Sequence, residues 1–119
     1  MSVTEATFAD QLVAEAPEAR AVVDEHLLDQ DGELLLHLLM SDLLRFVVQK
    51  FHGGERDVAR RCLDFVDRAL RDGDESVANA VAVSFVENVG SGPGETDAFV
   101  ASWPTALLAE KARQDAWRE

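Results

Sequence analysis

Hydrophobic residues recur every three or four positions along most of the chain, which is the pattern of helices that bury one face. In the N-terminal part this spacing predicts a helix that begins after Thr4 or Thr7 and ends near Ala16. A second helix is expected to begin at Pro17, because the first turn of a helix leaves unpaired the N–H that proline lacks. The expected apolar stripe of this second helix is Val22, Val23, His26 and Leu27.

The segment 34–51 is apolar on nearly every side, which predicts a central helix packed by several neighbours. Its many leucines favour helix over strand, and His52-Gly53-Gly54 is expected to end it. A fourth helix over 55–71 has opposite charges four residues apart on the face away from its apolar stripe. These pairs are Asp57 with Arg61, Asp64 with Arg68, and Asp67 with Arg71. Since each contributes only about 0.2–0.5 kcal/mol, we expect a solvated face rather than a site.

Turn residues separate the later elements. Asp72-Gly73-Asp74 is a tight connection, and Asp74 or Ser76 can cap a fifth helix that runs to about Val89. After the glycine-rich loop 90–94, further helices are expected over 96–102 and 104–117. The sequence therefore predicts one all-α domain over 1–119, a compact bundle or short stack of antiparallel helical hairpins with six to seven helices. The expected core is Leu35, Leu38, Leu39, Leu43, Phe46, Val66, Leu70, Val81 and Phe85.

The formal net charge of −12 over 119 residues narrows the choice of partner. A nucleic-acid backbone would be repelled, whereas a basic protein would be attracted, so we expect a basic protein partner and no direct nucleic acid. No apolar run approaches the roughly 20 residues of a membrane span, and the first residues lack the pattern of an export signal. The single Cys62 rules out an internal disulfide and fits a reducing cytoplasm.

Catalytic and metal-binding patterns are weak. His26, His37 and His52 fall on or beside different predicted helices, and none has a second ligand at metal-site spacing. Cys62 lies on an apolar stripe, which predicts a buried, unreactive thiol. The loop 90–94 lacks the lysine of a phosphate-binding loop. We therefore expect no metal, no cofactor and no enzyme activity, although a Ser–His or Cys–His pair assembled in space stays open.

Two groups of residues are candidates for partner binding. The first is an acidic cluster near the end of the second helix, where the helix dipole disfavours negative charge and a binding role would explain the cost. Its members are Asp24, Glu25, Asp29, Asp31 and Glu33. The second consists of Arg45 and Glu87, which lie among apolar residues. A structural contact of Arg45 with Glu87 or Asp42 is the first interpretation; the alternative is that Arg45 and Glu87 line a concave binding surface.

Two resemblances extend these expectations. The segment from Glu55 to Val89, with its acidic turn and following valine, resembles a HEAT-type helical hairpin. From about Phe8 to Phe99 the chain resembles a family of small bacterial helical proteins without an established activity. The matching stretches are Asp31-Gly32-Glu33, Asp42-Leu43-Leu44-Arg45 and Val83-Ser84-Phe85-Val86-Glu87-Asn88. This second resemblance implies an accessory protein, in some members immunity-like or antitoxin-like, and supplies no catalytic residue.

Two functions follow as hypotheses. The first is a non-catalytic protein-binding domain, an immunity-like or antitoxin-like protein that neutralises a basic toxin in the cytoplasm. The alternative is an adaptor or scaffold that binds a partner helix in a HEAT-like groove. The first predicts an acidic surface whose binding weakens with added salt, and the second predicts an exposed apolar groove.

Overall fold

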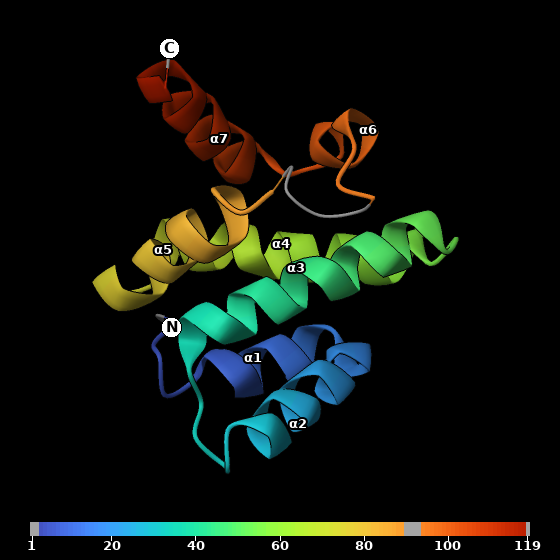
Figure 1. Cartoon of the computed structure of the whole chain (residues 1–119), viewed down its shortest axis with the longest axis vertical. Helices are drawn as coiled ribbons and strands as arrows, with labels where there is room; N and C mark the ends of the chain where they lie inside the picture. The colour runs from blue at the N-terminus through green and yellow to red at the C-terminus, as the bar shows by residue number, and fades with distance from the viewer. Residues whose placement is uncertain (1–2, 90–93, 119) are drawn as a thin grey trace.

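A computed structural model describes residues 3–89 and 94–118, which are helical with connecting turns and contain no strand (Figure 1). The described part has seven α-helices, a 3-10 turn (η1) and a π-helical segment (η2). Their bounds are α1 Phe8–Glu15, η1 Pro17–Ala19, α2 Arg20–Asp29, α3 Leu36–His52, α4 Arg56–Asp72, α5 Glu75–Val81, η2 Ala82–Val86, α6 Asp97–Ala101 and α7 Thr105–Arg118. The all-α fold class is confirmed.

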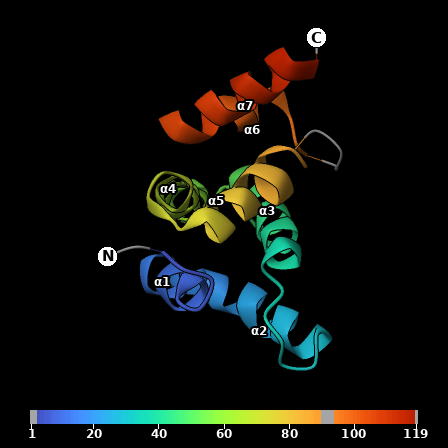
Figure 2. The same cartoon turned by 90° about the vertical axis from the view of Figure 1, so that its left-hand side faces the viewer.

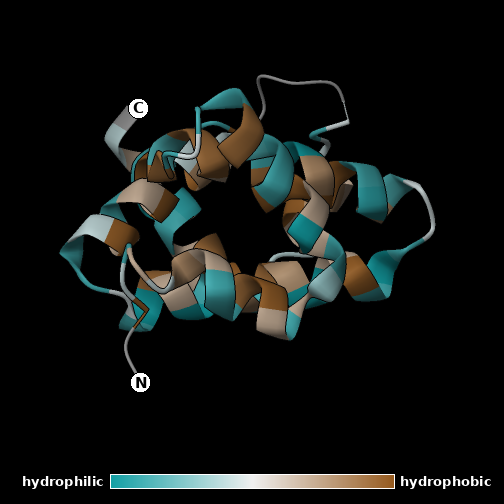
Figure 3. Cartoon of the chain, turned by 90° about the horizontal axis from the view of Figure 1, so that it is seen from below, coloured by the Kyte–Doolittle hydropathy of each residue, from teal (hydrophilic) through white to brown (hydrophobic). Residues whose placement is uncertain are grey.

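The helices are arranged in three layers, which Figures 1 and 2 show from two sides. The α1–α2 pair packs beneath α3 and α4, which lie with α5 in the middle layer. On the opposite side, α7 packs on α4 and η2, with α6 beside it. Figure 3 shows apolar and polar segments alternating along the helices, as expected for helices that bury one face each.

Several helices begin where the sequence predicts, for local reasons. Asp74 caps α5 by accepting a hydrogen bond from the Val77 N–H at 2.9 Å. Thr96 caps α6 in the same way, accepting from the Phe99 N–H. Pro17 opens η1, as its missing N–H allows. These positions depend on one side chain and its nearest neighbours along the chain, which is why the sequence alone identifies them.

The predicted fifth helix does not continue regularly to Val89. After α5 the backbone widens into the π-helical segment η2, where the Glu87 N–H donates to the Ala82 carbonyl five residues earlier. The same carbonyl also accepts a hydrogen bond from Gln114 Nε2 of α7 at 2.9 Å. This side chain from a distant part of the chain helps to hold the wider turn, so the local pattern did not reveal it.

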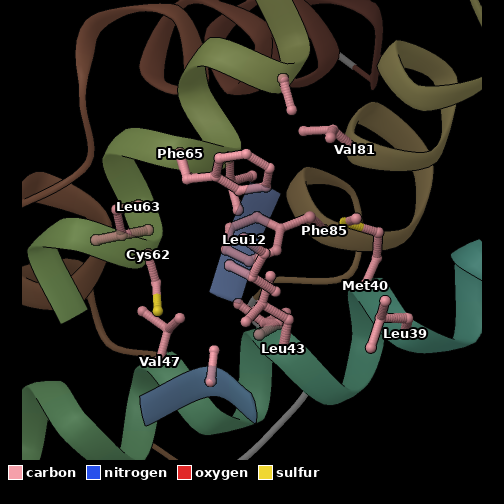
Figure 4. Packing of buried hydrophobic residues seen from close by; sticks show 14 of the residues in the cluster. Leu12, Leu39, Met40, Leu43, Val47, Cys62, Leu63, Phe65, Val81 and Phe85 are labelled. Carbon is pink, nitrogen blue, oxygen red and sulfur yellow. The ribbon is translucent and has the colours of Figure 1, made fainter. Parts of the chain in front are cut away.

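The core confirms most of the predicted residues and corrects one. Leu39, Leu43, Val66, Val81 and Phe85 are buried, and Figure 4 shows Leu39, Leu43, Val81 and Phe85 among the side chains of the core. Leu35, Phe46 and Leu70 are half-buried. Leu38 was wrongly predicted, because its side chain is 48% exposed. The buried positions of α3 are Leu36, Leu39, Met40, Leu43, Leu44, Val47, Val48 and Phe51, and Leu38 lies outside this stripe.

The sequence predicts a solvated charged face on α4, and this prediction is wrong for one of its residues. Asp67 is buried, and its Oδ1 accepts a hydrogen bond from the Leu107 N–H at 3.0 Å, in the first turn of α7. Its Oδ2 accepts from Arg71 Nε at 3.1 Å, which is the predicted pair. Asp67 therefore joins α4 to α7.

Two arginines of α4 also reach another layer. Arg61 donates two hydrogen bonds to the carboxylate of Glu18 in η1, at 2.9 and 3.1 Å. Arg68 pairs with Glu15 of α1 instead of the predicted Asp64. The spacing within α4 could not reveal these contacts, because their partners lie 43 and 53 positions earlier in the sequence.

Candidate functional site

A cleft of about 310 Å³ lies between α2 and α3. We call it the acidic cleft. Its lining residues are Val22, Glu25 and Asp29 from α2, and Asp42, Arg45, Phe46 and Gln49 from α3.

Helical periodicity places these side chains on facing stripes. On α2 the lining positions are spaced by three and four residues, and on α3 by three, one and three residues. Such positions lie on one side of a helix, so each helix presents a single stripe to the cleft. Packing of α2 against α3 then brings the two stripes together.

The cleft contains more negative than positive charge. Three carboxylates and one guanidinium line it, for a formal net charge of −2. Arg45 is paired with Asp42, three residues earlier on α3. Within residues 3–89 and 94–118, Glu25 and Asp29 form no ion pair with a basic side chain. These two exposed carboxylates are therefore available to a cation from another molecule.

A buried histidine supports the base of the cleft. His26 of α2 is 1% exposed, and its Nε2 accepts a hydrogen bond from the Leu35 N–H at 3.0 Å. A neutral ring that accepts at Nε2 carries its proton on Nδ1. That nitrogen lies 3.4 Å from Oδ2 of Asp42, although it makes no hydrogen bond within the described residues. His26 thus fixes the segment before α3 against α2.

The seven predicted binding residues are all exposed, but the structure brings only three of them into one cleft. Glu25, Asp29 and Arg45 line the acidic cleft, whereas the other predicted residues of the N-terminal cluster do not. Asp24 lies on α2, and Asp31 and Glu33 lie in the connection between α2 and α3.

The alternative contacts proposed for Arg45 are also resolved. Arg45 pairs with Asp42, as the first interpretation allowed. Glu87 instead lines a separate depression of about 260 Å³ with Arg113, Gln114 and Trp117. Arg45 and Glu87 therefore line different depressions rather than a shared one.

Sequence reasoning missed the apolar part of the cleft. Val22 was placed on the buried stripe of its helix and Phe46 in the core, yet both are half-buried and line the cleft. Gln49, which also lines the cleft, was not among the predicted binding residues. The spacing of three and four residues from Asp42 to Gln49 could have shown that these side chains share one face of α3. It could not show that this face borders a cleft, because the opposite wall comes from α2.

One contact resembles part of a nucleophilic site. His37 Nδ1 of α3 lies 2.7 Å from Oγ of Ser84 in η2, two residues 47 positions apart in the sequence. Ser84 is buried, whereas His37 is exposed. In a nucleophilic site the base is itself oriented by a third group. No carboxylate pairs with His37 in the described ranges, and the contact serves to join α3 to η2.

Cys62 is buried, as predicted, and burial raises the pKa of its thiol to about 12. Such a thiol remains protonated near neutral pH, and the protonated form is a poor nucleophile. Among the residues that the structure describes, no group of three or more His, Cys, Asp or Glu side chains could hold a metal ion.

Comparison with known proteins identifies a family. The family model "Domain of unknown function (DUF7674)" matches residues 9–118. The chain belongs to this family. The matched range contains both helices of the acidic cleft, so the cleft is formed by the DUF7674 domain itself. No curated protein and no solved structure gives a significant match. None of the described helices has the length and apolar character needed to cross a membrane.

Proposed function

We propose that this DUF7674 chain is a non-catalytic protein-binding domain whose acidic cleft receives a basic side chain of a partner protein. The observation that carries the proposal is the position of Glu25 and Asp29. These carboxylates line a cleft together with Asp42, and they have no basic partner within the described residues. Unpaired carboxylates on a cleft wall favour a lysine or an arginine as the group that enters.

The apolar lining supports the same ligand. Lysine and arginine have an apolar stem and a charged head, and they bury the stem while the head remains polar. Val22 and Phe46 offer apolar surface to the stem, and the carboxylates accept hydrogen bonds from the head. The volume of about 310 Å³ is near the lower end of the roughly 300–1,000 Å³ typical of ligand pockets, which suits one or two side chains.

The charge of the whole chain adds an effect on association rate. A net charge of −12 attracts a basic partner over several ångströms and accelerates the encounter at low salt. Added salt screens this attraction over a distance of about 8 Å at physiological ionic strength. A basic toxin neutralised in the cytoplasm is the partner that we propose, because this chemistry requires a basic protein and the free thiol of Cys62 suits a reducing compartment.

Comparative capture from the source cells tests the proposal. The full chain and the variant Glu25→Gln/Asp29→Asn are immobilised, and captured proteins are quantified at low and high salt. The control variant Asp10→Asn/Glu75→Gln removes the same amount of charge from exposed positions outside the cleft. We expect a basic protein that the wild type and the control retain at low salt, and that the cleft variant loses.

The purified partner then gives the decisive measurement. Its association rate should fall in the cleft variant at low salt, and the difference should shrink as salt is added. Equal capture and equal association by the wild type and the cleft variant would reject the acidic cleft as the binding site. A partner that binds both equally and resists salt would instead favour the adaptor hypothesis.

A further inference from the structure

A second small cleft, of about 140 Å³, has the opposite charge. It lies where the end of α3, the first two turns of α4 and the end of α6 meet. We call it the arginine pocket. Its lining residues are Phe51, Arg56, Ala59, Arg60, Leu63 and Ser102. Of the residues that the structure describes, two arginines and no acidic residue line it, although the chain as a whole carries 23 acidic residues and a net charge of −12.

Arg56 contacts an aromatic ring and has no carboxylate partner within the described residues. Its guanidinium lies over the ring of Phe51, 4.2 Å from the ring centroid. Phe51 is itself buried, and its ring packs edge-on against Phe99. A guanidinium stacked on an aromatic face keeps its N–H groups at the edge of the plane, where they can donate to a planar acceptor.

The absence of a carboxylate beside Arg56 is unusual for this chain. Among the lysine and arginine side chains that the structure describes, all except Arg20 and Arg56 lie within 3.9 Å of a carboxylate oxygen. Arg60, the second arginine of the pocket, has the longest of these contacts, 3.9 Å to Asp64. Both members of that pair are 55% exposed, so solvent screens the attraction between them.

The remainder of the pocket is apolar. Ala59 and Leu63 are buried residues of α4, and they form the floor together with Phe51. Ser102 Oγ donates its proton to the Phe99 carbonyl at 2.6 Å, so it offers no donor to an anion. The volume is close to that of an engineered cavity of about 150 Å³ that holds benzene. The pocket therefore has room for one ring or one branched aliphatic group beside the two guanidinium groups.

We propose that the arginine pocket binds a monocarboxylate that carries a compact apolar group, with Arg56 and Arg60 bound to the carboxylate and the apolar group on Phe51 and Leu63. Arginine matches a carboxylate with two parallel N–H···O bonds, which explains the choice of this anion. A phosphate or a polyanion would carry more negative charge toward a strongly negative chain and would leave the apolar floor uncovered. The carboxylate can come from a free acid or from the C-terminal residue of a peptide.

Protein-observed NMR of the full chain tests the proposal. The probes are 3-phenylpropanoate, which represents a free acid, and N-acetyl-Gly-Phe, which represents a peptide C-terminus. Each is paired with its amide, in which the carboxylate has been replaced. We expect both carboxylates to shift the amide resonances of Leu63 and Ser102, and we expect the amides to bind at least about tenfold more weakly, because charge-assisted hydrogen bonds are lost. The tighter of the two carboxylates identifies the source.

Matched variants localise the binding. Arg56→Gln/Arg60→Gln should weaken both carboxylates by about tenfold or more, whereas Arg20→Gln removes one exposed arginine elsewhere and should change affinity by less than about twofold. Arg60→Gln alone provides a second test if the double variant loses its dispersed spectrum, since Arg60 has only the long contact with Asp64. Equal binding of acids and amides, tighter binding of inorganic phosphate, or unchanged affinity in the arginine variants would overturn the proposal.

Discussion

The acidic cleft and the arginine pocket are built on the same helix, yet they carry opposite charge. The middle of α3 lines the first, between α2 and α3, and the end of α3 lines the second, against α4 and α6. The first has a formal net charge of −2 and the second of +2. The net charge of a chain is therefore a poor guide to the charge of any one site, even at −12.

The two regions also differ in how strongly a charged side chain without an opposite charge beside it indicates a binding site. In a chain with 23 acidic and 11 basic residues, many carboxylates must lack a basic partner, so the position of Glu25 and Asp29 in one cleft says more than their lack of a partner. An arginine without a carboxylate is less expected in the same chain. Within the described residues Arg56 is such a residue, and its guanidinium lies over the ring of Phe51.

The largest expected effect concerns the helix that both sites share. Leu39→Ala should lower the free energy of unfolding by about 2–5 kcal/mol, because Leu39 is fully buried and its truncation leaves a cavity. Leu38→Ala, next to it but 48% exposed, should cost less than about 1 kcal/mol. Denaturant unfolding measures both. Similar losses in the two variants would contradict the placement of α3.

A smaller effect is expected from the hydrogen bond that joins α4 to α7, and it should be confined to the α6–α7 side of the molecule. Asp67→Ala removes the acceptor for the Leu107 N–H and should cost about 1–3 kcal/mol. Asp64→Ala, an exposed position on the same helix, should cost less than about 0.5 kcal/mol. Hydrogen exchange should increase in α6 and α7 of the Asp67 variant and remain unchanged in α2. Equal increases at both ends would show that the two sites are not stabilised separately.

The acidic cleft itself should be less stable than its neutral variant. Asp29 is the last residue of α2, where the helix dipole disfavours a negative charge, and Glu25 is one turn earlier. Glu25→Gln/Asp29→Asn should therefore raise the free energy of unfolding by about 0.3–1 kcal/mol at low salt. Thermal unfolding at two salt concentrations measures the gain, which should shrink with salt. A loss of stability would mean that these carboxylates have a structural role.

The smallest expected effect concerns the ion pair between Glu18 and Arg61, an arginine of α4 that does not line the arginine pocket. Hydrogen bonds from Arg61 lower the pKa of the Glu18 carboxyl from its ordinary value of 4.5. A carboxyl whose pKa is lower in the folded than in the unfolded protein stabilises the fold at pH values above its ordinary pKa. This contribution is lost as the pH falls from the ordinary pKa through the lower pKa of the folded protein. The urea midpoint should therefore fall less between about pH 6 and about pH 3 in Glu18→Gln than in the wild type. An equal fall would show that the pair does not stabilise the fold.

Much of the fold was predictable from the sequence, because it depends on local patterns. Pro17, Asp74 and Thr96 act on the backbone within three residues of themselves, so the starts of η1, α5 and α6 could be recognised. The spacing of leucines located α3 within two residues at its beginning and one at its end. The same spacing could not show which side of α3 faces solvent, and Leu38 was therefore misplaced in the core.

The candidate site was only partly predictable. Acidic residues adjacent in the sequence indicated the N-terminal cluster, but only the packing of α2 on α3 selected Glu25 and Asp29 from it. The arginine pocket gave no signal, because residues 55–73 contain as many acidic as basic residues and appear neutral. Its charge emerges because the packing of the helices turns Arg56 and Arg60 of α4 toward the pocket, while none of the acidic residues of α4 lines it.

The sequence by itself determined the all-α class, the approximate position of each helix, the buried thiol of Cys62 and the overall negative charge. These properties depend on composition or on neighbours within one or two helical turns. Only the tertiary structure decided the pairing of charges, the π-helical segment η2, and the two clefts of opposite sign. The physical reason is that each of these requires side chains or backbone groups that are distant in sequence to come within a few ångströms of one another.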